Sequence, residues 1–142
     1  MSDFVVDASV AVKWFVNETD SELADDLSSI QHRLFAPKLI VTEVANVLAR
    51  KAVAGLLPAD RAFGFLRSLP NYLNDVIDID ELTEPAFHNA VLLRHPIYDL
   101  IYLEAARRLD ALLITADRRL VEKLASTEHA RYVTLLSDWQ SA

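Results

Sequence analysis

Short apolar runs alternate with helix-like stretches along almost the whole chain, and this alternation constrains the fold more than any other feature. The runs, rich in β-branched and aromatic residues, cover residues 4–6, 34–36, 76–79, 112–115 and 132–135. Between them, apolar residues recur with helical spacing over residues 10–15, 20–30, 39–54, 59–69, 85–93, 96–108 and 117–125. Because short buried strands separated by helices form parallel sheets with both faces covered, the pattern predicts an α/β fold.

The size and composition of the chain agree with one such domain. The chain has 142 residues, of which 52% are hydrophobic and 25% charged. A chain of this length buries roughly 68–70% of its unfolded surface, which is enough for one hydrophobic core. The sequence contains no repeat, linker or low-complexity segment, so we expect a single domain over residues 1–142.

Glycine and proline mark where several helices should begin or end. Gly55 follows the stretch 39–54 and is expected to end that helix, because glycine tolerates the backbone conformation found there. Pro70 would stop the next helix, since proline has no amide hydrogen to donate. Pro85 and Pro96 would each open a further helix, since the first turn accommodates proline well.

The composition excludes several kinds of site and partner. There is no cysteine, so disulfides, thiolate catalysis, iron–sulfur clusters and cysteine-bound zinc are excluded. The chain carries 14 basic and 21 acidic residues, a net charge of −7, which by itself argues against nucleic-acid binding. The first residues lack a basic targeting segment, and no run approaches the roughly eighteen apolar residues of a membrane span. We therefore expect a cytoplasmic protein without a membrane segment.

Four carboxylates are distinctive because they lie against apolar runs. Asp7 and Asp117 come directly after predicted strands. Asp99 lies in the first turn of a predicted helix, and Glu43 lies near the start of another. Because open α/β sheets bind ligands beyond the carboxyl ends of their strands, all four side chains could face one crevice. Clustered carboxylates repel one another unless a cation neutralises them, and an oxygen-only set favours Mg²⁺ or Mn²⁺. Such an ion activates water, which predicts hydrolysis of a phosphodiester.

Each of these carboxylates also has a purely structural explanation. Asp7 is suited to a turn at a strand end, and Asp117 is suited to a helix N-cap. Asp99 suits a helix N-terminus, where the helix dipole favours negative charge. Glu43 could belong to a solvated helix face. The combination of the four, more than any one of them, favours a functional site.

The other charged and aromatic residues are less informative. Eight basic residues either contact RNA phosphates or form ordinary solvated helix faces: Lys38, Arg50, Lys51, Arg107, Arg108, Arg118, Arg119 and Lys123. His95, like the other histidines, shows no metal-ligand spacing, and we expect it to have a surface or capping role. Tyr102 and the other aromatic residues are expected in the core or at dimer contacts.

The four carboxylates occur in four ordered segments that together identify a family. The segments are Val5-Val6-Asp7-Ala8-Ser9, Thr42-Glu43-Val44-Ala45-Asn46-Val47-Leu48, Tyr98-Asp99-Leu100-Ile101-Tyr102-Leu103-Glu104-Ala105-Ala106 and Ile114-Thr115-Ala116-Asp117. Over nearly the whole chain they resemble the PIN domain, and more narrowly the VapC toxins of VapBC toxin–antitoxin pairs. The resemblance implies a three-layer PIN-like sandwich, in which helices flank a five-stranded parallel sheet of order 3-2-1-4-5.

The same resemblance implies a function. It implies a Mg²⁺- or Mn²⁺-dependent endoribonuclease that acts as the toxin of a type II pair, with RNA as substrate. It also implies a VapB-type antitoxin as partner and a homodimer as the assembly. The metal-binding and catalytic residues that it implies are Asp7, Glu43, Asp99 and Asp117. Ser9 and Thr115 match supporting hydroxyl positions. Arg118 and Arg119 follow the last segment, where the family often has acidic residues, so one metal ion is expected rather than two.

Two other functions remain open from the sequence. A non-catalytic PIN-like domain would bind RNA or a protein, although it would not need all four carboxylates. A phospho-acceptor signalling domain shares the α/β fold, but it usually has paired acidic residues after its first strand and a lysine after its fifth. Here Val6 precedes Asp7, and Thr134-Leu135-Leu136 contains no lysine, so this second alternative is less favoured.

Overall fold

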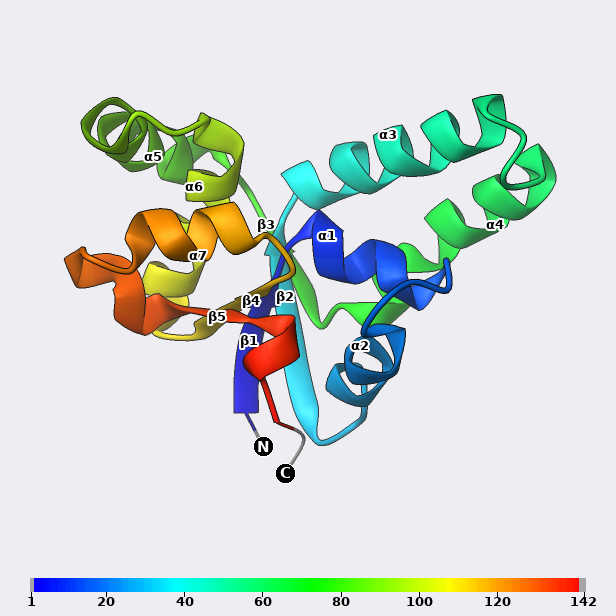
Figure 1. The fold of residues 1–142 in the computed structure, drawn as a ribbon, viewed down its shortest axis with the longest axis horizontal. Coiled ribbons are helices and arrows are strands. Elements are labelled where there is room, and N and C mark those ends of the chain that lie inside the picture. The colour runs from blue at the N-terminus through cyan, green and yellow to red at the C-terminus, as the bar shows by residue number, and fades with distance from the viewer. Residues whose placement is uncertain (1, 141–142) are drawn as a thin grey trace.

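Five parallel strands form the central sheet of the molecule (Figure 1). The computed structural model describes residues 2–140. The strands are β1 (Ser2–Val6), β2 (His32–Pro37), β3 (Asp75–Ile77), β4 (Leu112–Thr115) and β5 (Val133–Leu135). Their order is β3-β2-β1-β4-β5, and every neighbouring pair is parallel. This confirms the α/β class and the strand order that the resemblance implied.

Helices cover both faces of this sheet. They are α1 (Ala8–Ala11), α2 (Ser21–Leu27), α3 (Leu39–Val53), α4 (Ala59–Ser68), α5 (Asp80–Leu93), α6 (Ile97–Leu109) and α7 (Arg118–Leu124). Short 3₁₀ helices lie at Val12–Trp14, Leu69–Tyr72, Glu128–Tyr132 and Leu136–Asp138. Figure 1 shows α1 to α4 on one side of the sheet and α5 to α7 on the other, which confirms the three-layer sandwich. None of the helices within residues 2–140 is both long enough and apolar enough to cross a membrane.

The core is built around the two middle strands and helix α6. Val5 and Val6 of β1 and Leu113 and Ile114 of β4 are fully buried, as expected for strands with helices on both sides. In α6 every residue from Leu100 to Ala106 is buried, so this helix is enclosed on all sides rather than along one stripe. Because α6 is held so firmly, the polar side chains at its first turns have fixed positions.

The end of α3 confirms the role predicted for Gly55. Its backbone has φ +76°, and the amides of Gly55 and Leu56 donate to the carbonyls of Ala52 and Lys51 at 3.1 and 2.9 Å. This pair of bonds is a Schellman motif, which satisfies carbonyls that the helix itself cannot use.

The start of α5 differs from the prediction, because Pro85 lies inside the helix rather than opening it. The helix begins at Asp80, so the predicted strand 76–79 ends at Ile77. Proline leaves the carbonyl four residues earlier, that of Glu81, without its amide donor. The guanidinium of Arg108 donates to that carbonyl from 3.0 Å, so a partner from α6 compensates for the missing bond.

We expect opposite stability changes when the two glycines of the chain are replaced by alanine. Gly55→Ala should lower the free energy of unfolding by roughly 1–2 kcal/mol, because alanine is strained in the left-handed conformation. Gly64→Ala, inside α4 and with open space around the new methyl group, should raise it by roughly 0.5–1 kcal/mol. Urea unfolding of both variants measures the difference. Equal effects of the two substitutions would contradict the assignment of Gly55 as the helix-ending residue.

Candidate active site

A groove of about 450 Å³ opens where the carboxyl ends of β1 and β4 lie side by side. Strand β1 pairs with β2 on one side and with β4 on the other, so this edge is the point at which the strand order reverses. The walls of the groove include all four of the carboxylates singled out in the sequence: Asp7, Glu43, Asp99 and Asp117. Tertiary structure therefore brings together residues that follow β1 and β4 with residues of α3 and α6.

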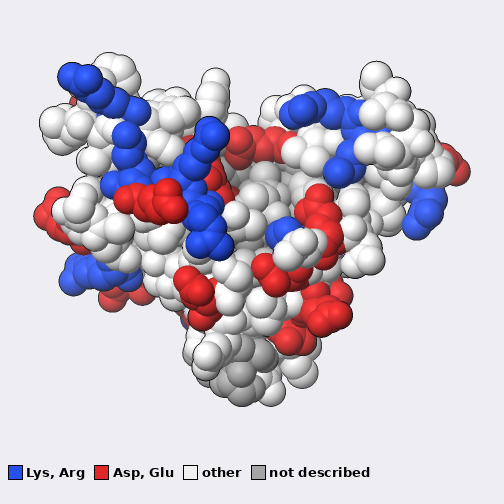
Figure 2. Space-filling model, in the orientation of Figure 1, with Lys and Arg blue, Asp and Glu red and all other residues white. Residues whose placement is uncertain are grey.

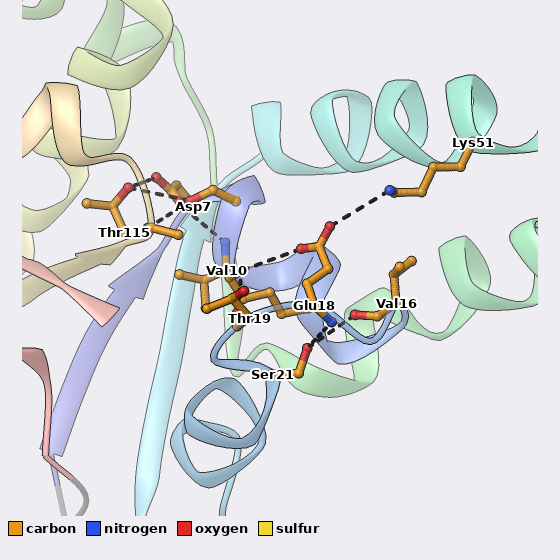
Figure 3. Close-up of polar contacts among 11 residues, drawn as sticks. Asp7, Val10, Val16, Glu18, Thr19, Ser21, Lys51 and Thr115 are labelled. Carbon is orange, nitrogen blue, oxygen red and sulfur yellow. Dashed lines mark hydrogen bonds and ion pairs between the residues drawn. The ribbon is translucent and has the colours of Figure 1, made fainter. Parts of the chain in front are cut away.

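Asp7 is the most buried of the four, with an exposed fraction of 4%. Its Oδ1 accepts hydrogen bonds from the Ser9 hydroxyl at 2.5 Å and from the Val10 amide at 3.2 Å, and its Oδ2 accepts one from the Thr115 hydroxyl. Burial raises the pKa of Asp7 to about 6, although the two hydroxyl bonds oppose the change; the charge of Asp99 adds to it. Ser9 and Thr115 thus support Asp7 directly, as Figure 3 shows for Thr115.

Asp117 both caps a helix and lines the groove. Its Oδ1 accepts hydrogen bonds from the amides of Arg119 and Leu120 at 2.9 and 3.3 Å, so the N-cap prediction for this residue is confirmed. Its own amide donates to the Thr115 hydroxyl at 3.0 Å. The Ser9 hydroxyl accepts a bond from the Ala116 amide at 2.9 Å. These contacts join the loops that follow β1 and β4.

Glu43 is bound by a tyrosine from across the groove. The Tyr102 hydroxyl donates to Glu43 Oε1 at 2.6 Å, and Tyr102 itself is only 1% exposed. Partial burial raises the pKa of Glu43, the bond from Tyr102 opposes this, and the charge of Asp99 adds to it. Burial and the neighbouring Glu43 carboxylate raise the pKa of Tyr102, so its hydroxyl keeps the proton that it donates. The prediction of Tyr102 as a core residue is confirmed, but its contact with Glu43 was not foreseen.

Asp99 is paired with His95, for which the sequence predicted only a surface or capping role. His95 Nε2 lies 2.7 Å from Asp99 Oδ2, and only 10% of the His95 side chain is exposed. In the sequence, only the spacing of these residues along the helix could have indicated the contact. His95 is four residues before Asp99, and Tyr102 is three residues after it, so both lie one helical turn from Asp99. Tyr102 lines the groove itself, whereas His95 lines the adjoining hollow.

Burial is the main cause of the raised pKa of Asp7 and of Glu43, and repulsion by one neighbouring carboxylate adds to it. Asp99 contributes to the raised pKa of both Asp7 and Glu43. All four carboxylates hold at least one partner from the protein itself. Within residues 2–140, no three His, Asp or Glu side chains are placed so that together they could hold a metal ion. The donor set nevertheless consists of carboxylate oxygens with unbalanced negative charge, which chemically suits a hard divalent cation.

The structure places seven of the eight candidate RNA-binding cations in two groups, beside the groove or in ion pairs elsewhere; Arg118 is exposed and belongs to neither. Figure 2 shows acidic side chains along the central hollow and basic side chains on the helical lobes beside it. Arg50 and Lys51 line a hollow that adjoins the groove along α3, whereas Arg119 and Lys123 line another that shares Asp99 and Asp117 with it. Three other cations are paired with carboxylates elsewhere: Lys38 with Asp78, Arg107 with Glu104 and Arg108 with Glu81.

Comparisons with known proteins agree with the geometry. The family model described as PIN domain matches residues 4–125. The chain is 36% identical over 123 residues to Ribonuclease VapC3 of Pyrobaculum aerophilum, a match that covers 84% of this chain and 92% of that protein. The crystal structure of PAE2754 from Pyrobaculum aerophilum is similar with a TM-score of 0.73 and 22% identity, over 96% of this chain and 90% of that one. VapBC2 from Rickettsia felis, bound to a DNA fragment from its promoter, is similar with a TM-score of 0.67 and 10% identity, over 97% and 99% of the two chains.

The raised pKa of Asp7 makes a prediction for stability in the absence of metal. The folded protein binds the Asp7 proton more tightly than the unfolded chain, because the pKa changes from 3.8 to about 6. The stabilisation from this proton is complete below about pH 4 and is lost as the pH rises through about 6. The Asp7→Asn side chain stays neutral at every pH. As the pH rises from about 4 to about 7, the free energy of unfolding of Asp7→Asn should therefore increase by about 2–3 kcal/mol relative to that of the wild type.

Urea unfolding in EDTA across this pH range measures the effect. Asp60→Asn changes the same charge at an exposed position on α4, away from the groove, and should follow the wild-type curve. An Asp7→Asn curve parallel to that of the wild type would contradict the prediction.

Proposed function

Because the chain belongs to the PIN domain family, we propose that it is a metal-dependent endoribonuclease and the toxin of a type II toxin–antitoxin pair. Its similarity to Ribonuclease VapC3, over 92% of that protein, supports RNA as the substrate. The alternative of a phospho-acceptor signalling domain has no support from the family match.

The observation that carries the proposal is the meeting of mutually repelling carboxylates in one groove. Asp7 directly follows β1, whereas Glu43 and Asp99 lie on α3 and α6. Burial raises the pKa of Asp7 and of Glu43, and the charge of Asp99 adds to both changes. A cluster of this kind is stable in its ionised form when a divalent cation neutralises it. On their own these carboxylates would repel RNA, but they can also bind the cation that the hydrolysis requires.

The residues of the groove have distinct roles in this proposal. The ligands of a Mg²⁺ or Mn²⁺ ion would be Asp7, Glu43, Asp99 and Asp117. When bound, the ion supplies positive charge that polarises a water and a phosphate oxygen for hydrolysis of the phosphodiester. Ser9 and Thr115 each donate a hydrogen bond to one of the two oxygens of Asp7. Tyr102 donates to one oxygen of Glu43, and the second oxygen of Glu43 accepts no bond from Tyr102. A single ion is proposed, since Arg118 and Arg119 follow Asp117.

The proposed partner is a VapB-type antitoxin that inhibits the enzyme by covering the groove. Structures of two VapBC assemblies support this proposal at the level of the fold: VapBC2 from Rickettsia felis and VapBC-1 from nontypeable Haemophilus influenzae. The second has a TM-score of 0.64 at 15% identity. A homodimer remains part of the proposal.

The proposal is tested by RNA cleavage with the purified protein. We expect cleavage with Mg²⁺ or Mn²⁺ and none in EDTA. Asp7→Asn and Asp99→Asn should each lower the rate by about 100-fold or more, because each removes a charged ligand from the site. Asp60→Asn serves as the control outside the groove. Cleavage that survives EDTA or both substitutions would contradict the metal mechanism, whereas RNA binding without cleavage would favour the non-catalytic alternative.

Tyr102→Phe tests the support given to Glu43. Removal of the hydroxyl deletes a hydrogen bond to a charged group, and the pKa of Glu43 then rises further. We expect cleavage to fall by roughly tenfold and its acid limb to move to higher pH, and we expect the Mn²⁺ concentration needed for half-maximal rate to increase. Tyr72→Phe removes a hydroxyl from a tyrosine that stacks on Trp14 and should change none of these. Unaltered metal and pH dependence in Tyr102→Phe would show that the contact is only structural.

A further inference from the structure

One edge of the groove carries two lysines that share a single glutamate. Lys13, in the 3₁₀ helix after α1, is the only cationic residue that lines the groove within the described part of the chain. Its ammonium donates to the Thr19 carbonyl at 2.7 Å and lies 3.5 Å from Glu18 Oε1. The other oxygen of Glu18 lies 3.8 Å from the ammonium of Lys51 on α3. Figure 3 shows Glu18 extended toward Lys51 at this edge.

These ion pairs are more sheltered than ordinary surface pairs. The exposed fractions of the side chains are 10% for Lys13, 25% for Lys51 and 33% for Glu18. The loop that carries Glu18 is also fixed, because the Glu18 amide donates to the Ser21 hydroxyl at 2.9 Å and that hydroxyl donates to the Val16 carbonyl at 3.2 Å. Glu18 is therefore held between the lysines by the fold of its loop.

The opposite edge of the groove has no such arrangement. Arg94, Arg119 and Lys123 line a hollow of about 550 Å³ that shares Asp99 and Asp117 with the groove. Across residues 2–140, no ion pair joins any of these three cations to a carboxylate. Cations are available to a bound polyanion on this side, while on the α3 side Glu18 already lies against Lys13 and Lys51.

The α3 side continues the groove toward a second hollow. This hollow, of about 640 Å³, is lined by Arg50 and Lys51 and meets the groove at Val47. A nucleic-acid strand that leaves the groove in this direction therefore passes Lys13 and Lys51. Since an ammonium group binds phosphate and carboxylate oxygens alike, such a strand competes with Glu18 for both lysines.

We propose that Glu18 occupies the place of an RNA phosphate between Lys13 and Lys51, and that RNA must displace it in order to bind along α3. The inference rests on the proposed function in its choice of RNA as the ligand. Glu18 then acts as a built-in competitor that keeps binding of RNA weak, and Lys13 and Lys51 become phosphate contacts only after it has moved.

The test is the affinity for RNA of the full chain and its variants in EDTA, where no cleavage occurs. The probe is a short fluorescein-labelled single-stranded RNA of mixed sequence, and the readout is fluorescence anisotropy. At about 0.1 M salt, Glu18→Gln should bind this RNA about five- to tenfold more tightly, because it removes a negative charge a few ångströms from the phosphate. Glu81→Gln, which releases Arg108 in a hollow that shares no residue with the groove, makes the same change of charge and should leave the affinity unchanged.

A second variant separates displacement from a general effect of charge. In Glu18→Gln combined with Lys51→Gln, the gain in affinity should be largely lost, because the cation that Glu18 released is gone. Urea unfolding confirms that each variant is folded. Equal affinities of Glu18→Gln and Glu81→Gln, or a gain that survives the loss of Lys51, would overturn the proposal.

The same measurements distinguish this inference from the ribonuclease proposal. If the wild type cleaves RNA with Mg²⁺ but Glu18→Gln binds like Glu81→Gln, only the competitor role of Glu18 is wrong. If no variant cleaves RNA yet Glu18→Gln binds it more tightly, the ribonuclease proposal fails and the role of Glu18 is supported. If neither the wild type nor Glu18→Gln binds the RNA in EDTA, the competitor role of Glu18 is overturned, and cleavage with Mg²⁺ alone decides the ribonuclease proposal.

Discussion

Burial of the Asp7 carboxylate between two hydroxyl groups is the interaction on which the groove depends. A buried carboxylate is unfavourable without hydrogen-bond donors, and here Ser9 and Thr115 supply them. Thr115 is 108 residues away in the sequence and reaches Asp7 because β1 pairs in parallel with β4, with Val6 beside Ile114. The sheet therefore sets both the position of Asp7 and its raised pKa. The same hydroxyl of Thr115 accepts a hydrogen bond from the Asp117 amide, so this contact also holds the Asp117 side of the groove in place.

The distribution of charge reconciles an acidic chain with a nucleic-acid substrate. A net charge of −7 opposes RNA binding only if the charges are spread evenly, and they are not. Carboxylates concentrate in the groove, while cations flank it on the lobes of α3 and α7. The two flanks differ, because Glu18 neutralises lysines on one side only. Overall charge is therefore a poor guide to function here, and the local field around the groove is the better one.

Local sequence signals were reliable where the backbone alone decides the structure. Gly55 ends α3 as expected, because only the conformation of that residue and its two amides matter. Pro85 was misleading for the opposite reason. Pro85 leaves the Glu81 carbonyl of α5 without its amide donor, and Arg108 donates to that carbonyl instead. Arg108 belongs to α6, which neighbours α5 only after folding. A rule based on the proline alone has no access to such a partner.

The sequence by itself determined the alternation of strands and helices and drew attention to Asp7, Glu43, Asp99 and Asp117, because apolar periodicity and carboxylates beside apolar runs are visible without coordinates. The resemblance to a family added the strand order. Only the tertiary structure decided what those carboxylates contact. Tyr102 binds Glu43 across 59 residues of sequence, and Glu18 lies between two lysines from separate helices. Hydrogen bonds and ion pairs act over a few ångströms, so their partners are chosen by how the helices pack on the sheet, which spacing along the chain does not specify.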